Sequence, residues 1–177
     1  MKYKTIVADP PWQYRNKKMF GKYRKEMGHI DGGANAHYST MALKEIQNLH
    51  LIKQISDKDC VLFLWATTPM LPEAFSVLGA WGFHYKTMMI WVKTKTLPMG
   101  YWFRVHTEEC LIGIRGKVKA FRQTLPNLFF APITKHSKKP EKFFQIIDPI
   151  IPRPAIELFA RNERQGWDSW GNEIKGG

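Results

Sequence analysis

The residues with the clearest chemical potential are Asp9, Pro10, Pro11 and Trp12, which directly follow the apolar run Thr5–Ala8. An acidic residue at the carboxyl end of a buried parallel strand lies where open α/β sheets bind their ligands. The prolines stiffen the turn and lack N–H groups, so we expect its carbonyls to point outward as free acceptors. The carboxylate and the indole could bind a planar amino group and stack on its ring. The alternative is a rigid turn with a packing tryptophan.

The chain is strongly basic, with 27 Lys and Arg against 15 Asp and Glu, a formal net charge of +12. Such a charge attracts phosphate polymers and raises the rate of encounter with them. Nucleic acid or a nucleotide is therefore the predicted partner, and a generic basic surface is the alternative. The most basic segments, which we expect to contact a phosphate backbone, are residues 13–25, 115–122 and 135–142.

Cysteine usage and hydropathy bear on the compartment in which the protein works. Cys60 and Cys110 lie in apolar runs without C-x-x-C spacing, so they are predicted to be buried, reduced thiols. The six histidines are scattered, and no metal site is expected. The sequence shows neither a signal-peptide pattern nor a membrane-spanning apolar run, so we expect a cytoplasmic protein.

Strand and helix patterns alternate along the first half of the chain. Residues 13–36 form a basic, Gly-containing stretch that we expect to be a loop. Thr40 is a suitable N-cap for a helix. The run Cys60–Ala66 is continuous and apolar, as in a strand covered on both faces. A second helix should follow and end at Gly79 or Gly82. The apolar positions at helical spacing are Leu43, Ile46 and Leu49, then Leu71, Phe75 and Leu78.

The second half continues the alternation. Pro140 suits the first turn of a helix, which leads to a strand over Ala155–Ala160. Three more strands are expected over residues 86–92, 109–114 and 128–133. Strands alternating with helices predict an α/β fold with a mostly parallel, doubly wound sheet and helices on both faces. We expect residues 1–177 to form one domain that carries residues 13–36 as a basic loop insert.

The Asp-Pro-Pro-Trp turn and several later segments resemble the MT-A70-like family of adenine N6-methyltransferases. The segments follow the family's order, and the resemblance covers nearly the whole chain. They are His37–Met41, Phe63–Trp65, Ile90–Thr94, Gly100–Trp102, Glu108–Gly113, His136–Pro140, Ile156–Arg161 and Trp167–Asn172. The chain departs from the best known member where Ala160 replaces a glycine and Glu173 replaces a glutamine.

The resemblance implies a Rossmann-like methyltransferase in permuted order, with the catalytic motif first and the cofactor-binding motif last. It implies S-adenosylmethionine as the methyl donor and the exocyclic N6 amine of adenine as the acceptor. Lys139 is implied to bind the methionine carboxylate, beside the start of the helix that follows. The implied catalytic residues are Asp9, Pro10, Pro11 and Trp12. The other implied cofactor-binding residues are Asp9, Phe159, Arg161, Asn162, Asn172 and Glu173.

The chemistry implied for this site must activate a poor nucleophile, because the lone pair of the adenine amine is delocalised into the ring. If the Asp9 carboxylate and the Pro10 carbonyl each accept one N–H, the nitrogen is drawn toward tetrahedral geometry in front of the methyl group. Trp12 and Tyr38 are expected to flank a base that has left its stack.

Other residues are expected to contact the substrate. Glu108 should contact the same nucleotide, with an ion pair to the basic residues 115–122 as the alternative. Glu109 should face the opposite side of the strand. Further predicted contacts are Lys17, Lys18 and Arg24.

DNA is the expected substrate, because the chain is compact and the sequence has no accessory RNA-binding motif such as a zinc finger. Methylation of RNA adenosine and a catalytically silent, nucleic-acid-binding subunit are the alternatives. An NAD-dependent oxidoreductase is disfavoured, because no Gly-x-Gly-x-x-Gly follows the first strand. A homodimer or a partner subunit remains open.

Overall fold

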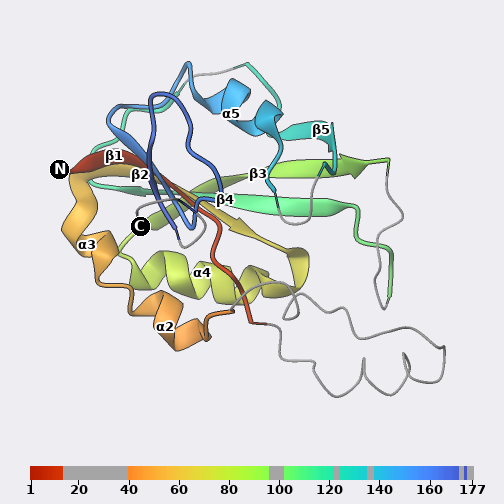
Figure 1. Ribbon diagram of the computed structural model, residues 1–177, viewed down its shortest axis with the longest axis horizontal. Helices are drawn as coiled ribbons and strands as arrows, with labels where there is room; N and C mark the ends of the chain where they lie inside the picture. Colours follow the sequence, from red (N-terminus) through yellow and green to blue (C-terminus); the bar gives the residue numbers. More distant parts are fainter. Residues whose placement is uncertain (14–39, 96–101, 122–123, 135–137, 172–173, 175–177) are drawn as a thin grey trace.

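The computed structural model describes residues 1–13, 40–95, 102–121, 124–134, 138–171 and 174. In this part of the chain, seven strands form one sheet in the order β5-β3-β4-β2-β1-β6-β7 (Figure 1). The strands are β1 (Tyr3–Ala8), β2 (Ser56–Ala66), β3 (His84–Thr94), β4 (Thr107–Arg115), β5 (Leu128–Pro132), β6 (Ala155–Leu158) and β7 (Asp168–Trp170). The helices are α2 (Leu43–Gln47), α3 (Leu51–Ile55), the 3-10 helix η2 (Thr68–Met70), α4 (Leu71–Ala80) and α5 (Glu141–Ile147).

The sheet is mostly parallel, as predicted. β1 pairs in parallel with β2 and β6, β6 with β7, and β3 with β5. β4 is the exception, because it pairs antiparallel with both β2 and β3. The sequence between β3 and β4 carries no helical pattern, and without a crossover helix the chain returns antiparallel to the strand it has just left.

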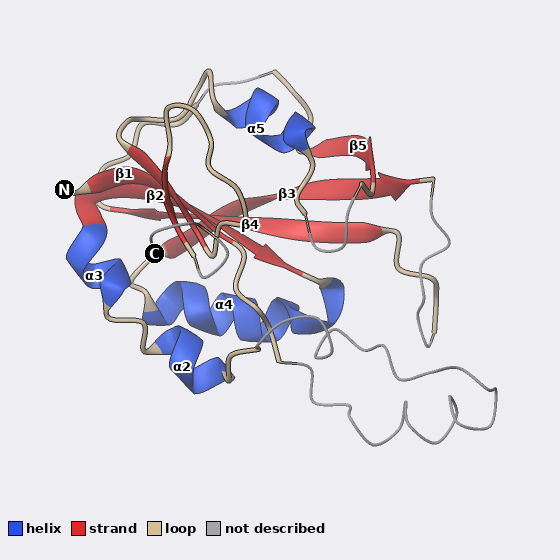
Figure 2. Cartoon of the chain, in the orientation of Figure 1, coloured by secondary structure: helices blue, strands red, loops and turns tan. Residues whose placement is uncertain are grey.

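Helices cover both faces of the sheet, which confirms the predicted α/β class. Helices α2, α3 and α4 lie on one side of the strands and α5 lies on the other (Figure 2). The apolar side chains of α4 belong to one buried cluster and those of α5 to a second. Among the described helices, none is long and apolar enough to cross a membrane.

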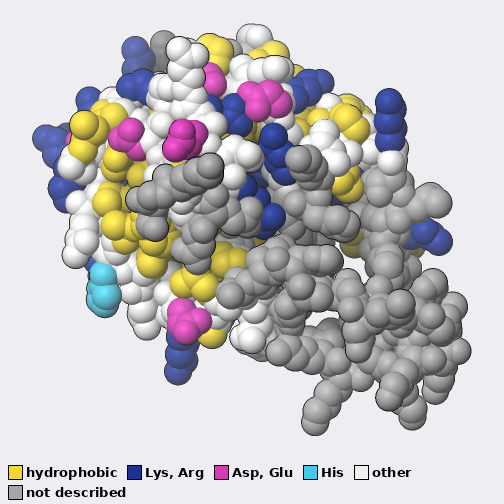
Figure 3. Space-filling model, viewed as in Figure 1, with side chains coloured by type: hydrophobic (Ala, Val, Ile, Leu, Met, Phe, Trp, Pro, Cys, Tyr) yellow, Lys and Arg dark blue, Asp and Glu magenta, His cyan; other side chains and the backbone are white. Residues whose placement is uncertain are grey.

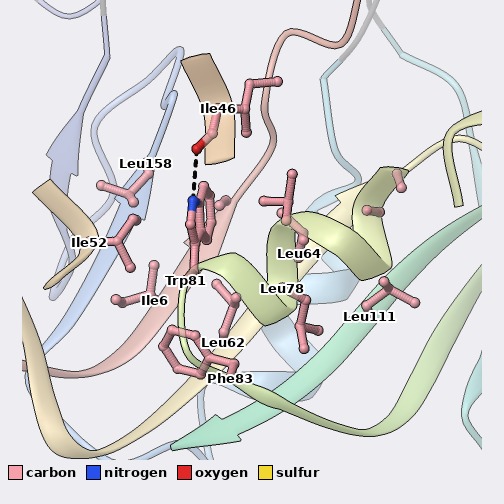
Figure 4. Packing of buried hydrophobic residues seen from close by; sticks show 14 of the residues in the cluster. Ile6, Ile46, Ile52, Leu62, Leu64, Leu78, Trp81, Phe83, Leu111 and Leu158 are labelled. Atoms are coloured by element: carbon pink, nitrogen blue, oxygen red, sulfur yellow. Dashed lines mark hydrogen bonds between the residues drawn. The ribbon is translucent and has the colours of Figure 1, made fainter. Parts of the chain in front are cut away.

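Side chains along β2 alternate between the two cores, as the period of a strand requires. Leu64 belongs to the cluster under α4, whereas Phe63 belongs to the cluster under α5. In the first cluster, the Trp81 indole N–H donates to the carbonyl of Ile46 at 2.8 Å and joins α4 to α2 (Figure 4). Because both faces of the central strands are buried, the part of β2 from Cys60 to Ala66 is an unbroken apolar run.

The helix expected after Thr40 begins later than predicted. Its N-cap is Ala42, whose backbone N–H donates to the Glu45 carboxylate at 2.6 Å. The predicted helix also ends at Gln47, before Leu49, and α3 is a second short helix that was not predicted. The end of α4 agrees with prediction, because Gly82 takes φ +80° and the N–H of Phe83 bonds the Leu78 carbonyl at 3.0 Å, a Schellman motif.

The carboxyl-terminal strand is shorter than predicted. β6 ends at Leu158 because Phe159 turns the backbone with φ 59°. The short edge strand β7, which the sequence patterns did not predict, pairs with β6. Cys60 and Cys110 are buried and free, in agreement with prediction.

Candidate active site

The Asp-Pro-Pro-Trp turn leaves the carboxyl end of β1 and closes on itself. The N–H of Trp12 donates to the Pro10 carbonyl at 2.8 Å, and the N–H of Met41 donates to the Pro11 carbonyl at 2.9 Å. The expectation that these carbonyls are free acceptors is therefore wrong, because the turn and the returning chain use them. A carbonyl has two lone pairs, so Pro10 can accept one further N–H. Asp9 lies where the turn leaves β1, and 21% of its side chain is exposed.

Trp12 anchors this turn to the sheet. Its ring is 6% exposed within the core cluster under α4, and its indole N–H donates to the Trp65 carbonyl at 3.0 Å. The structure therefore gives Trp12 a structural role that the sequence reasoning treated as the alternative. Stacking of Trp12 on a substrate base stays a prediction.

Four charged side chains of alternating sign meet at the carboxyl edge of the sheet. The Lys139 ammonium lies 2.8 Å from the Asp9 carboxylate and 2.6 Å from the Glu108 carboxylate. Lys93 pairs with the other oxygen of Glu108 at 2.8 Å. The alternative ion pair of Glu108 with residues 115–122 is wrong, because these two lysines occupy its carboxylate.

The register of β4 explains how Glu108 reaches this position. Cys110 points into the core under α5, so Glu108, two residues earlier, points to the same face as α5. Glu109 points to the opposite face, as predicted, where its carboxylate accepts hydrogen bonds from Thr68 and Thr107.

Burial and mutual contact shift the acid–base properties of this cluster. Burial raises the pKa of Asp9, the Lys139 charge opposes this rise and the Glu108 charge adds to it. Burial also acts to raise the pKa of Glu108, but Lys139 and Lys93 outweigh it and hold that pKa below its usual value. Burial would lower the pKa of Lys139, yet Asp9 and Glu108 raise it above its ordinary value. Lys139 is therefore a fixed cation between two acids.

Trp65 lies beneath this cluster. The Lys139 ammonium is 5.3 Å from the centre of the Trp65 ring, a cation–π contact. The Trp65 indole N–H is buried and has no hydrogen-bond partner within the described ranges. Aromatic packing against Phe143, at 4.9 Å between ring centres, fixes the indole beside the start of α5. The floor of the site is therefore rigid and aromatic.

Beside the cluster opens a cavity of about 430 Å³, within the size range of small-molecule sites. Its lining is polar and charged, with Phe144 and Phe159 as the aromatic members. Five predicted cofactor-binding residues line it: Asp9, Lys139, Phe159, Arg161 and Asn162. The predicted positions that lie outside the described residues are Lys17, Lys18, Arg24, Tyr38, Asn172 and Glu173.

Sequence reasoning missed the other residues that line this cavity, and two of them, Glu157 and Arg164, carry charges within it. Glu157 is the one charged residue in the apolar strand β6, which is the signal that could have identified it. Burial raises the pKa of Glu157 to about 7, an effect that the Arg164 charge opposes. Arg164 lies over the Phe144 ring at 3.5 Å and pairs with Glu141 at 2.5 Å. Its buried Nε has no hydrogen-bond partner among the described residues.

The donors and acceptors around the cavity fit the chemistry of S-adenosylmethionine. Lysine and arginine side chains suit a carboxylate, whereas Asp9 and Glu157 suit an ammonium or sulfonium cation. Of the three N–H donors of Lys139, the described residues engage two, which leaves one for a ligand. Across the described ranges, no group of three or more His, Cys, Asp or Glu side chains is arranged to hold a metal ion.

A mostly parallel α/β sheet, an acidic turn after β1 and a charged cavity at the carboxyl edge are the features of a Rossmann-like methyltransferase. Comparison with known proteins agrees with this class. The chain belongs to the MT-A70 family, whose sequence model matches residues 3–173.

Relatives of two kinds match nearly the whole chain. It is 34% identical to the Type II methyltransferase M.MunI of Mycoplasma sp over 98% of its own length and 78% of that enzyme. It is 30% identical to an N(6)-adenosine-methyltransferase MT-A70-like protein of Arabidopsis thaliana and 28% identical to the human N(6)-adenosine-methyltransferase catalytic subunit METTL3. It covers 97% and 99% of its own length in these two matches, but spans only 24% and 29% of the two eukaryotic proteins.

Proposed function

We propose that this chain transfers a methyl group from S-adenosylmethionine to the N6 amine of adenine in DNA. The observation that carries the proposal is the Asp9 carboxylate, which lies at the edge of the charged cavity and is held by Lys139 at 2.8 Å. DNA is favoured because the chain is 34% identical to the Type II methyltransferase M.MunI, against 30% and 28% for the two relatives named for adenosine.

Asp9 and the Pro10 carbonyl would act on the adenine amine. Each would accept one N–H, so that the nitrogen lone pair leaves conjugation with the ring and turns toward the methyl donor. S-adenosylmethionine supplies a methyl group activated by the positively charged sulfur to which it is bonded. The Lys139 ammonium, 2.8 Å from Asp9, favours the charged carboxylate against the opposing effect of burial and fixes its orientation.

The cofactor would be held by the charged lining of the cavity. Lys139 would donate its remaining N–H to the methionine carboxylate, and Glu157 would accept from the methionine ammonium. Arg161 and Asn162 would contact the ribose, together with Asn172 and Glu173. Phe159 would line the part of the cavity that holds the cofactor. Only 8% of the Lys139 side chain is exposed, which supports a binding role, because a lysine that served only solubility would extend into solvent.

The test is transfer of labelled methyl groups to unmethylated DNA and to RNA in parallel, with nucleoside analysis of the product. Asp9→Asn should lower the rate at least about 100-fold while leaving cofactor affinity within a few fold. Asp57→Asn is the matched control and should retain full activity, because Asp57 lies at the amino end of β2, away from the edge of the sheet that carries the site. Lys139→Ala should weaken cofactor binding by about 10- to 100-fold, and full retention would refute this assignment.

Transfer to RNA but not to DNA would replace the proposed substrate with RNA. Cofactor binding without transfer to either polymer would favour the silent nucleic-acid-binding subunit, or a required partner or second copy. A cytosolic location is part of the proposal, and the buried free thiols Cys60 and Cys110 support it.

A further inference from the structure

Two adjacent aromatic side chains are almost fully exposed. Trp102 has 93% and Phe103 has 86% of its surface in contact with solvent. The next most exposed aromatic side chain in the described part of the chain is Phe130, at 56%. A single exposed apolar residue is ordinary, but two neighbouring large rings indicate a binding surface.

These rings lie on the connection that leads into the active site. Residues 95–106 join β3 to β4, and these two strands carry Lys93 and Glu108 of the charged cluster. Trp102 is six residues from Glu108. Since an extended chain spans at most about 3.3–3.6 Å per residue, its Cα lies within about 20 Å of the Glu108 Cα. Successive nucleotides of one strand rise about 3.4 Å along the duplex axis, so a nucleotide near the target base is within reach.

The charges around the two rings are all of one sign. From residue 95 to residue 107 the sequence contains Lys95, Arg104 and His106 but no Asp or Glu. Lys95, Arg104 and His106 are all exposed. Surfaces that bind single strands combine basic side chains, which track the phosphate backbone, with aromatic rings on which bases stack. The charge pattern therefore favours a nucleic acid over a protein as the occupant.

We propose that Trp102 and Phe103 form a base-stacking site that holds the nucleic acid next to the adenine to be methylated. The inference rests on the proposed function, because it deepens the description of that substrate site. Extrusion of a base from a duplex breaks its stacking, and an aromatic ring against a neighbouring base offsets part of that loss. Arg104, directly after the two rings, is placed to contact the backbone phosphate of the same strand.

The test compares Trp102→Ala, Phe103→Ala and the double variant with the wild-type chain. Binding to an unmethylated DNA duplex is measured by fluorescence anisotropy and cofactor affinity by calorimetry. Each single variant should bind DNA about tenfold more weakly and the double variant more weakly still, with cofactor affinity unchanged. Tyr85→Ala is the matched control, because Tyr85 is 40% exposed and lies at the far end of β3. Trp102→Tyr should retain most of the affinity, because it keeps a flat ring.

Two results would overturn the inference. DNA affinity equal to wild type in the double variant would show that the rings bind no base. A fall in molecular mass by light scattering, with unchanged DNA affinity per chain, would show that they bind a protein surface instead. The proposed function can fail while this inference holds. If DNA binding depends on the rings but the wild-type chain transfers no methyl group, this inference is kept and catalysis is rejected.

Discussion

Glu157 is a carboxylic acid in surroundings that disfavour its charge. Burial raises its pKa most strongly, and the nearby carboxylates of Asp9 and Glu141 add to the rise. The cations of Arg164 and Lys139 oppose it, and the result is a pKa of about 7 against an ordinary value of 4.5. In the folded protein Glu157 therefore changes charge near neutral pH, and it does so inside the cavity.

The raised pKa of Glu157 predicts a loss of stability as pH rises. Between about pH 4.5 and 7 the folded chain binds this proton and the unfolded chain does not, so folding is favoured at low pH and the advantage disappears above pH 7. Glu157→Gln should remove this dependence, and at pH 8 it should be more stable than wild type by up to about 3 kcal/mol. Urea unfolding at pH 5 and pH 8 measures the difference.

Glu163→Gln is the control for this experiment, because Glu163 lines the same cavity but is exposed. It should leave the pH profile of wild type unchanged. A Glu157→Gln variant that keeps the wild-type slope between pH 5 and pH 8 would contradict the assignment.

Single residues could be predicted where strand ends determine position. Asp9 follows β1, so its place at the carboxyl edge of the sheet follows from the order of the elements. Phe159 was implied by the family resemblance, because the strand pattern extended to Ala160. Glu157 could not be assigned in this way, because its pKa depends on depth of burial. The contact of Glu108 with Lys139 could not be predicted either, because it depends on the direction and register of β4.

Among the elements, the junction between β6 and β7 is tightly packed, and it carries Phe159 of the cavity lining. Phe159 takes a positive φ, and the N–H of Ala160 then donates to the Trp170 carbonyl at 3.0 Å. This brings the Gly171 Cα directly against the backbone of Ala160, where a Cβ would overlap its carbonyl oxygen and nitrogen. Glycine is therefore required at 171 for close approach of two backbones.

Gly171→Ala should destabilise the fold by about 1–3 kcal/mol and also weaken cofactor binding, because the displaced backbone carries Phe159 and Ala160. Gly79→Ala in α4 is the matched control. A Cβ there meets nothing within 4 Å, so the change should be neutral or stabilise by up to about 1 kcal/mol. Denaturant unfolding and cofactor titration of both variants provide the test, and equal stability of the two would show that the junction can relax.

The strand and helix patterns predicted most elements because both faces of the sheet are covered and its central strands contain continuous apolar runs. Three features escaped. The direction of β4 depends on the connection from β3, which has no helical pattern. The break between α2 and α3 falls where the apolar residues keep helical spacing. The strand β7 is too short to show alternation of apolar and polar residues. Each depends on pairing or packing with a distant element, which spacing along one segment does not show.

At the scale of the whole molecule, the positive charge is in excess, whereas the charged cluster of the site is balanced, with two carboxylates and two lysines. The net charge is +12, and Lys and Arg side chains (dark blue) are spread over much of the face seen in Figure 3, with acidic side chains among them. The carboxylates of Asp9 and Glu108 are instead largely enclosed and paired with lysines. The outer field can therefore attract a polyanion without being cancelled by the acids of the site.

The excess positive charge predicts a strong salt dependence of DNA binding. Between about 50 and 200 mM salt, DNA affinity should fall by roughly 50-fold or more, because each neutralised phosphate releases condensed counterions. Cofactor affinity, measured by titration over the same range of salt concentration, should change only a few fold, since a small ligand has no condensed counterions to release. A DNA affinity that is flat over this range would exclude phosphate contacts as the main source of binding.

The backbone bond from Met41 to the Pro11 carbonyl, together with the bridge between Trp12 and Met41, joins the chain on either side of residues 14–39. With its two ends fixed to each other, the length of the intervening stretch hardly affects the rest of the fold. Each doubling of a closed loop costs only about 0.6 kcal/mol. The fold can therefore accommodate insertions and deletions between Trp12 and Met41 at little cost in stability while Asp9 keeps its place.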